Sequence, residues 1–94
     1  MIRTLARYKV RPDHVGEALE IVRRFVEAVR AAEPDTECGA YQGGDGVTFI
    51  HIMGFPDEEA EHRHQQARYT VRFIEALLPH CEIRPSFLDL KPVE

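Results

Sequence analysis

Two histidines stand where a side chain could transfer protons near neutral pH. His51 lies inside an apolar run, Val47 to Phe55, and His64 lies among the apolar positions of a predicted helix. Histidine titrates between pH 5 and 8, so either residue is a candidate general base. Each also has a simpler explanation: His51 as a hydrogen-bonded core residue, and His64 as a residue that packs a helix against a sheet.

Two arginines near the start of the chain could stabilise negative charge on a ligand. Arg3 and Arg7 occupy the same face of the segment 2–10, which alternates with period two and therefore predicts a strand. A guanidinium there could orient a phenolate or a carboxylate. A solvated strand face or an intersubunit ion pair would explain the same residues.

The remaining chemistry-bearing residues do not predict a metal site. His62 and His64 lie about 200° apart around a helix, so they cannot hold one ion. Glu58 and His62 form an expected exposed pair at i,i+4 spacing. Cys38 and Cys81 are too far apart in sequence for a close-spaced metal or redox pair.

Six predicted elements position these residues. Period-two patterns indicate strands, and apolar residues at three- and four-residue steps indicate helices. Asp13 is the expected N-cap of the first helix, and Pro85 places the last strand at an edge or beside a bulge. The predicted strands span 2–10, 36–42, 47–55 and 82–90, and the predicted helices span 14–32 and 57–78.

The order β-α-β-β-α-β predicts an α+β, ferredoxin-like fold that forms a single domain over residues 1–94. Its usual form is a four-stranded antiparallel sheet with both helices on one face. The net charge is -4 and the basic residues are scattered, so we expect no nucleic-acid partner. No run approaches the length of a membrane span and the first residues lack an apolar h-region, so we expect a cytoplasmic protein.

One face of such a sheet is left without helices. Ile50 and Ile52 are expected to meet the helices, which would turn His51 and its apolar neighbours to the uncovered face. An apolar patch of that size predicts a homodimer, sheet against sheet, with a cavity between the two copies. The side chains expected on the uncovered face are Arg3, Leu5, Arg7, Lys9, Val47, Phe49, His51, Met53, Phe55, Leu88 and Leu90.

The segment Phe49-Ile-His-Ile-Met-Gly-Phe-Pro-Asp-Glu-Glu-Ala-Glu-His-Arg-His carries a resemblance that extends over nearly the whole chain in length and element order. It resembles the antibiotic biosynthesis monooxygenase family of the dimeric α/β-barrel superfamily. In that family a strand leads through a short turn to an acidic helix start and a helix histidine, which His64 matches. The histidine that often follows five residues later is Tyr69 here.

The resemblance implies oxygenation of a small aromatic, a phenol or a quinol, without any cofactor. Molecular oxygen reacts slowly with closed-shell molecules, so such an enzyme needs a base to form an electron-rich anion and a group to stabilise the developing charge. The implied catalytic residues are His51, His64 and Arg7, with Phe49, Met53, Phe55, Arg3 and Tyr69 around the substrate.

Two alternatives remain open at this point. The same cavity could bind a small molecule without catalysis, in a dimer used for sensing or storage. The superfamily also includes haem-degrading enzymes, which would make His64 a haem ligand. That branch needs a tryptophan, and this chain has none.

Overall fold

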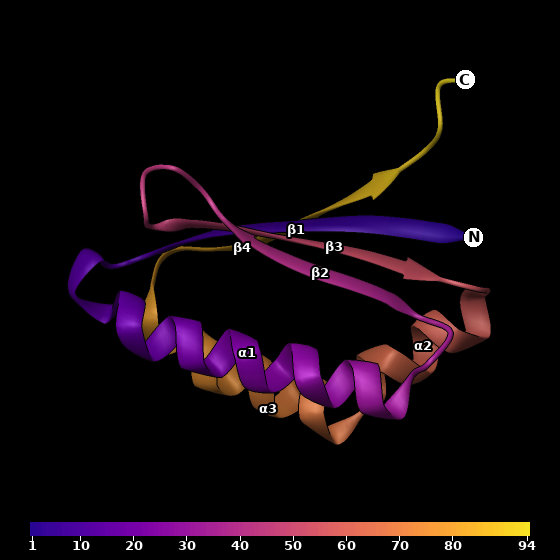
Figure 1. The fold of residues 1–94 in the computed structure, drawn as a ribbon, viewed down its shortest axis with the longest axis horizontal. Helices are drawn as coiled ribbons and strands as arrows, with labels where there is room; N and C mark the ends of the chain where they lie inside the picture. Colours follow the sequence, from indigo (N-terminus) through magenta and orange to yellow (C-terminus); the bar gives the residue numbers. More distant parts are fainter.

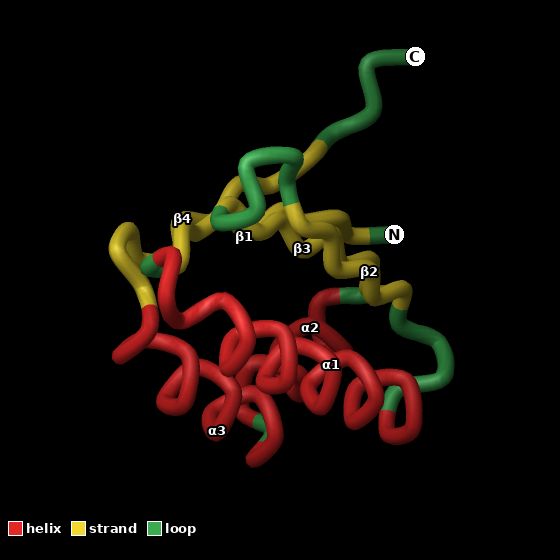
Figure 2. Tube along the Cα trace, turned by 60° about the vertical axis from the view of Figure 1, so that its left-hand side comes forward, coloured by secondary structure: helices red, strands yellow, loops and turns green.

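The computed structural model describes residues 1–94 as one sheet with all of its helices on one face (Figure 1). Figure 2 shows the strands as a layer above the helices. The predicted ferredoxin-like α+β architecture is therefore confirmed. The strands are β1 (Ile2–Val10), β2 (Glu37–Gln42), β3 (Thr48–Phe55) and β4 (Cys81–Leu90), and the helices are α1 (Val15–Ala32), α2 (Glu58–Gln66) and α3 (Arg68–Leu77).

The strands are antiparallel and lie in the order β2-β3-β1-β4. The predicted edge position of the last strand is confirmed. The pairing of β1 with β4 also changes register between Arg7, which faces Ser86, and Lys9, which faces Ile83. The irregularity falls beside Pro85, whose ring leaves no N–H for the ladder.

Helix α1 packs one apolar stripe onto the sheet. Its buried residues are Ala18, Val22, Phe25 and Val29, spaced by three or four positions as an amphipathic helix requires. The prediction that Asp13 caps this helix is wrong. A 3-10 turn over Pro12–His14 precedes the helix, and no side chain caps either element.

The predicted helix over 57–78 is two helices. Ala67 adopts an extended conformation with ψ 141° and separates α2 from α3. Asp57 begins α2 by accepting a hydrogen bond from the backbone N–H of Ala60 at 2.8 Å. The sequence hides the break, because no glycine or proline marks Ala67 and apolar residues continue at helical spacing on both sides.

The facing of β3 is the reverse of the prediction. Tyr8 pairs with Phe49 and Ala6 with His51, so these side chains share the face that the helices cover. Ile50 and Ile52 point to the opposite face instead. The residues of β3 that the structure buries under the helices are Phe49, His51, Met53 and Phe55.

The error has a physical cause. Successive side chains of a strand point to opposite faces of the sheet, so a wrong assignment of one residue reverses all of them. The sequence shows which face is buried only when the other face is polar. Strand β3 is apolar on both faces, so hydrophobicity does not distinguish them. The space between sheet and helices accommodates the aromatic set, with Phe49 stacked on Tyr8 at a ring separation of 5.5 Å.

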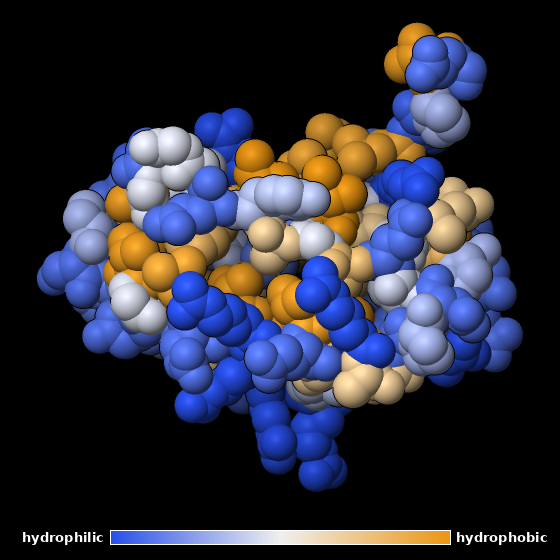
Figure 3. All heavy atoms as spheres, in the orientation of Figure 1, coloured by the Kyte–Doolittle hydropathy of each residue, from blue (hydrophilic) through white to orange (hydrophobic).

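The opposite side of the sheet, which we call the uncovered face, carries apolar side chains that no helix touches. Ile52 is 38% exposed and Leu88 is 61% exposed, and apolar residues gather over the strands on the upper side of Figure 3. Leu5 lies between these two in the register of the sheet. None of the helices is long and apolar enough to cross a membrane.

Candidate functional site

A cavity of about 410 Å³ lies between the sheet and the helices, with His51 and His64 both in its wall. This is a different place from the predicted cavity between two facing sheets. The apolar part of the lining comes from five elements and suits a flat hydrophobic ligand. Its members are Ala6, Phe25, Met53, Phe55, Phe73, Ile74 and Phe87.

Aromatic rings form the inner wall of this cavity. Phe25 of α1 stacks on Phe73 of α3 with centroids 4.1 Å apart. His51 lies 5.5 Å from Phe73, and the ring of Phe55 lies 5.1 Å from that of His64. Both imidazoles therefore belong to one aromatic cluster, and a planar ligand in the cavity could stack on its rings.

His64 is oriented by a carboxylate that the sequence analysis did not identify. Its Nδ1 lies 2.7 Å from Oε2 of Glu33, at the C-terminal end of α1. The hydroxyl of Tyr69 donates to the same carboxylate oxygen, and the hydroxyl of Thr36 donates to Oε1 at 2.9 Å. Three donors thus converge on one half-buried acid.

The electrostatics of this network fix the tautomer of His64. Burial would raise the pKa of Glu33, but hydrogen bonds from Tyr69, His64 and Thr36 outweigh it and hold that pKa below its ordinary value. Glu33 is therefore an ionised acceptor at neutral pH. Nδ1 of His64 must carry the proton that Glu33 accepts, and Nε2 has no hydrogen-bond partner in the protein.

His51 makes a different hydrogen bond. The hydroxyl of Tyr8 lies 2.8 Å from its Nε2, and both residues are buried. Desolvation lowers the pKa of His51 to about 4, and the same cause raises the pKa of Tyr8. Both side chains are neutral at pH 7.

The two predicted arginines lie outside the cavity. Arg3 and Arg7 point to the uncovered face, and Arg3 forms an ion pair with Glu37 at 2.8 Å there. The expectation that they share a pocket with His51 is wrong, because the sheet separates them. No lysine or arginine lines the cavity.

Two other predicted ligand contacts also lie elsewhere. Phe49 is buried against Tyr8 and borders a groove between α1 and β2. The hydroxyl of Tyr69 donates a hydrogen bond to Glu33, and Tyr69 does not line the cavity. Of the predicted substrate contacts, Met53 and Phe55 reach the cavity together with the two histidines.

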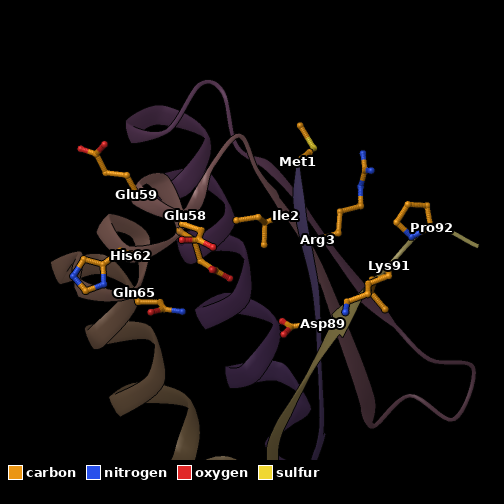
Figure 4. A pocket seen from close by; sticks show the side chains of 12 residues that line it. Met1, Ile2, Arg3, Glu58, Glu59, His62, Gln65, Asp89, Lys91 and Pro92 are labelled. Carbon is orange, nitrogen blue, oxygen red and sulfur yellow. The ribbon is translucent and has the colours of Figure 1, made fainter.

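The mouth of the cavity is polar and charged. Glu61, Gln65 and Asp89 line both the cavity and an outer hollow of about 840 Å³ that adjoins it. In Figure 4, the side chains of Glu58 and Asp89 approach this hollow from α2 and β4. Arg3 and Lys91 also line this hollow, and in Figure 4 the side chain of Arg3 extends away from the two carboxylates.

Sequence reasoning missed three residues that complete the site. Glu33 is 31 residues from His64, and nothing local pairs them. Tyr8 lies on the helix-facing side of β1, and its contact with His51 depends on the register of β1 with β3. Thr70 lines the cavity with a buried hydroxyl that has no hydrogen-bond partner. No group of three or more His, Cys, Asp or Glu side chains is placed to hold a metal ion.

No protein-family model matches the sequence, and no curated protein does. Solved structures match it closely in fold. An antibiotic biosynthesis monooxygenase is 20% identical with a TM-score of 0.91, and each chain is covered over 100% of its length. A putative antibiotic biosynthesis monooxygenase from Nitrosomonas europaea is 14% identical with a TM-score of 0.90, again over 100% of both chains.

A third structure, a putative antibiotic biosynthesis monooxygenase from Caulobacter crescentus, is 22% identical with a TM-score of 0.87. That match covers 99% of this chain and 90% of the other. At these identities the matches establish a shared fold. The resemblance predicted from the sequence is confirmed at that level.

Proposed function

We propose that this protein oxidises a small phenol or hydroquinone with molecular oxygen in the cavity between sheet and helices. The observation that carries the proposal is the Glu33–His64 pair. A carboxylate holds one imidazole nitrogen, the other is free, and the ring faces a cavity lined by aromatic side chains. That arrangement is a general base beside a site for a planar aromatic.

The chemistry balances without another reductant. The hydroxyl proton of the phenol moves to Nε2 of His64, and Glu33 stabilises the resulting imidazolium. A ring carbon of the phenolate forms a C–O bond with O2, and the proton returns to give a hydroperoxide. That carbon then loses its hydrogen as a proton while the O–O bond breaks, which releases water. Phenol and O2 become quinone and water, and O2 accepts all the electrons that the ring gives up.

The shared fold supports this reaction class. The structures compared above are described as antibiotic biosynthesis monooxygenases, some of them putatively. A fold alone does not determine a reaction, so the proposal depends on the site. The site of this chain supplies a base and an apolar cavity, which such an oxygenation needs.

The charges around the cavity define the substrate further. No cation lines it, and the carboxylates of Glu61 and Asp89 stand at its mouth. A substrate with its own carboxylate would meet two like charges at the mouth and no cation inside the cavity, because Arg3 and Lys91 line only the outer hollow. We therefore propose an uncharged phenol or hydroquinone, which becomes an anion only after its proton has moved to His64.

Oxygen uptake with candidate hydroquinones tests the function. We expect the wild-type protein to consume O2 and form the corresponding hydroxyquinone with one added oxygen atom, and His64→Gln to lower kcat by roughly 100-fold or more. His62→Gln is the matched control, because His62 is exposed on the same helix and does not line the cavity. Absence of turnover by a folded protein would overturn the proposal, and tight binding without chemical change would assign the cavity to ligand binding.

We also propose that the protein is a homodimer that buries the uncovered face. Ile52 and Leu88 lie on that face with large exposed fractions, and Leu5 lies between them. A contiguous apolar surface of this kind favours a two-fold contact with an identical copy. Sedimentation equilibrium should give twice the chain mass at micromolar concentration, and a stable monomer there would contradict the proposal.

A further inference from the structure

The cavity contains a second imidazole whose chemistry differs from that of His64. His51 is 3% exposed, and no charged group contacts its ring. Its neighbours are Tyr8, Phe25 and Phe73. A histidine in such surroundings stays neutral, and a neutral imidazole offers one donor and one acceptor. Which nitrogen is the donor depends on Tyr8.

The partners of Tyr8 decide the tautomer. Its hydroxyl is buried, and its one hydrogen-bond partner is Nε2 of His51. If Nε2 carried the proton, the hydroxyl hydrogen of Tyr8 would have no acceptor, at a cost of roughly 1–3 kcal/mol for a buried donor. If Tyr8 donates, both groups are satisfied. The proton of His51 then resides on Nδ1.

That Nδ1–H has no protein acceptor, and it reaches the cavity. His51 is part of the cavity wall, and no hydrogen bond from its Nδ1 to protein exists. The hydroxyl of Thr70 is the sole fully enclosed side-chain polar atom without a partner. Nδ1 of His51 is therefore not sealed in the core, and its open side is the cavity.

We propose that the Nδ1–H of His51, fixed by Tyr8, donates a hydrogen bond to the substrate oxygen atom that becomes negative when His64 takes the proton. The inference rests on the proposed function and assigns opposite roles to the two histidines. His64 accepts a proton, and His51 stabilises the charge left behind. Tyr8 is a positioning residue, because it acts through His51 and does not touch the substrate.

The need for this donor follows from what the cavity lacks. A phenolate forms readily only where hydrogen-bond donors or cations meet its charge, and a low-dielectric site strengthens each such contact. Both arginines that could have supplied a cation lie beyond the sheet. Thr70 also offers an unpartnered hydroxyl in the lining, but its hydrogen can rotate, whereas Tyr8 holds the N–H of His51 in one orientation.

The tautomer can be measured without any substrate. In ¹⁵N NMR spectra of the ligand-free protein, we expect His51 to show a protonated Nδ1 and an unprotonated Nε2 at pH 7. Tyr8→Phe keeps the ring that stacks on Phe49 but removes the hydroxyl, so His51 should shift toward a mixture of tautomers. A protonated Nε2 in the wild-type protein would overturn the inference.

The donor role is tested with 4-nitrophenol, a poorly oxidised phenol whose anion is yellow. We expect the wild-type protein to bind it with a raised anion fraction. His51→Leu should weaken binding of the anion by roughly 100-fold, as loss of one oxyanion donor does. His51→Gln retains an N–H donor and should restore part of the effect. Equal anion binding by the wild-type protein and His51→Leu would refute the donor role.

These readouts separate the inference from the proposed function. Both the tautomer and the binding of 4-nitrophenol are independent of turnover with oxygen. If they behave as expected while no hydroquinone is oxidised, only the oxygenation fails. If hydroquinones are oxidised while His51 has the other tautomer, only the role of His51 fails.

Discussion

The two faces of strand β3 carry similar hydrophobicity and have different roles. The covered face presents His51 and aromatic side chains to the helices, where the buried groups find partners such as Tyr8. The uncovered face presents Ile50 and Ile52, with no buried polar group among them. The imidazole lies on the side where the fold supplies a hydrogen-bond partner, and the other side carries the apolar surface that we propose as a dimer contact.

The largest expected difference between the two faces is the loss of unfolding free energy when a large side chain is replaced by alanine. Phe25→Ala would leave a cavity between α1 and Phe73 and should lower the free energy of unfolding by about 3–5 kcal/mol. Leu88→Ala on the uncovered face should cost the monomer less than about 1 kcal/mol, because Leu88 is largely exposed there. Urea unfolding of both variants measures this, and equal losses would contradict the division between the faces.

Acid should lower the free energy of unfolding through His51, which lies on the covered face. Its folded pKa is about 4, below the ordinary value of 6.5, so between these pH values the unfolded chain binds a proton that the folded chain does not. Stability from this group is thus complete above pH 6.5 and declines as the pH falls toward 4, by roughly 3 kcal/mol in total.

Urea unfolding at several pH values tests this dependence. His51→Gln should remove that part of the decline between pH 6.5 and 4, while His62→Gln should retain it because His62 is exposed. An unchanged pH dependence in His51→Gln would show that His51 does not carry the effect.

A charged side chain on the uncovered face should weaken the proposed dimer. Ile52→Lys places an ammonium in the proposed contact and should raise the Kd of the dimer at least about tenfold, or roughly 1.4 kcal/mol. Ile52 faces away from the cavity, so the tautomer of His51 should not change. Sedimentation velocity over a concentration series measures the shift, and Glu94→Lys serves as an exposed control.

The smallest expected effect concerns the mouth of the covered cavity. Replacing the two mouth carboxylates, Glu61→Gln with Asp89→Asn, should improve kcat/KM for a carboxylated phenol about threefold, the scale of a half-exposed charge contact. The value for an uncharged hydroquinone should stay the same. Added salt should reduce the gain, and a variant that accepts both substrates unchanged would exclude this source of selectivity.

Much of the fold could be predicted from local patterns. The alternation in residues 2–10, the stripe of α1 and the glycine-rich turn before β3 determine the element order, and that order determines the ferredoxin-like sheet. The break at Ala67 could not be predicted, because no residue there disfavours a helix. His51, His64, Met53 and Phe55 were predicted as site residues from their types, their places in the predicted elements and the family resemblance. They do meet in one cavity, although the predicted facing of β3 was wrong.

The sequence by itself determined which residues could do chemistry and which elements carry them, because residue type and periodicity are local properties. Only the tertiary structure decided which side of the sheet they share, because both faces of β3 are equally apolar and the choice depends on how the aromatic rings pack under the helices. The structure also paired His64 with Glu33 and His51 with Tyr8, contacts between residues 31 and 43 positions apart. Those pairings depend on helix and strand packing, and they are the basis on which we propose His64 as a base and His51 as a hydrogen-bond donor.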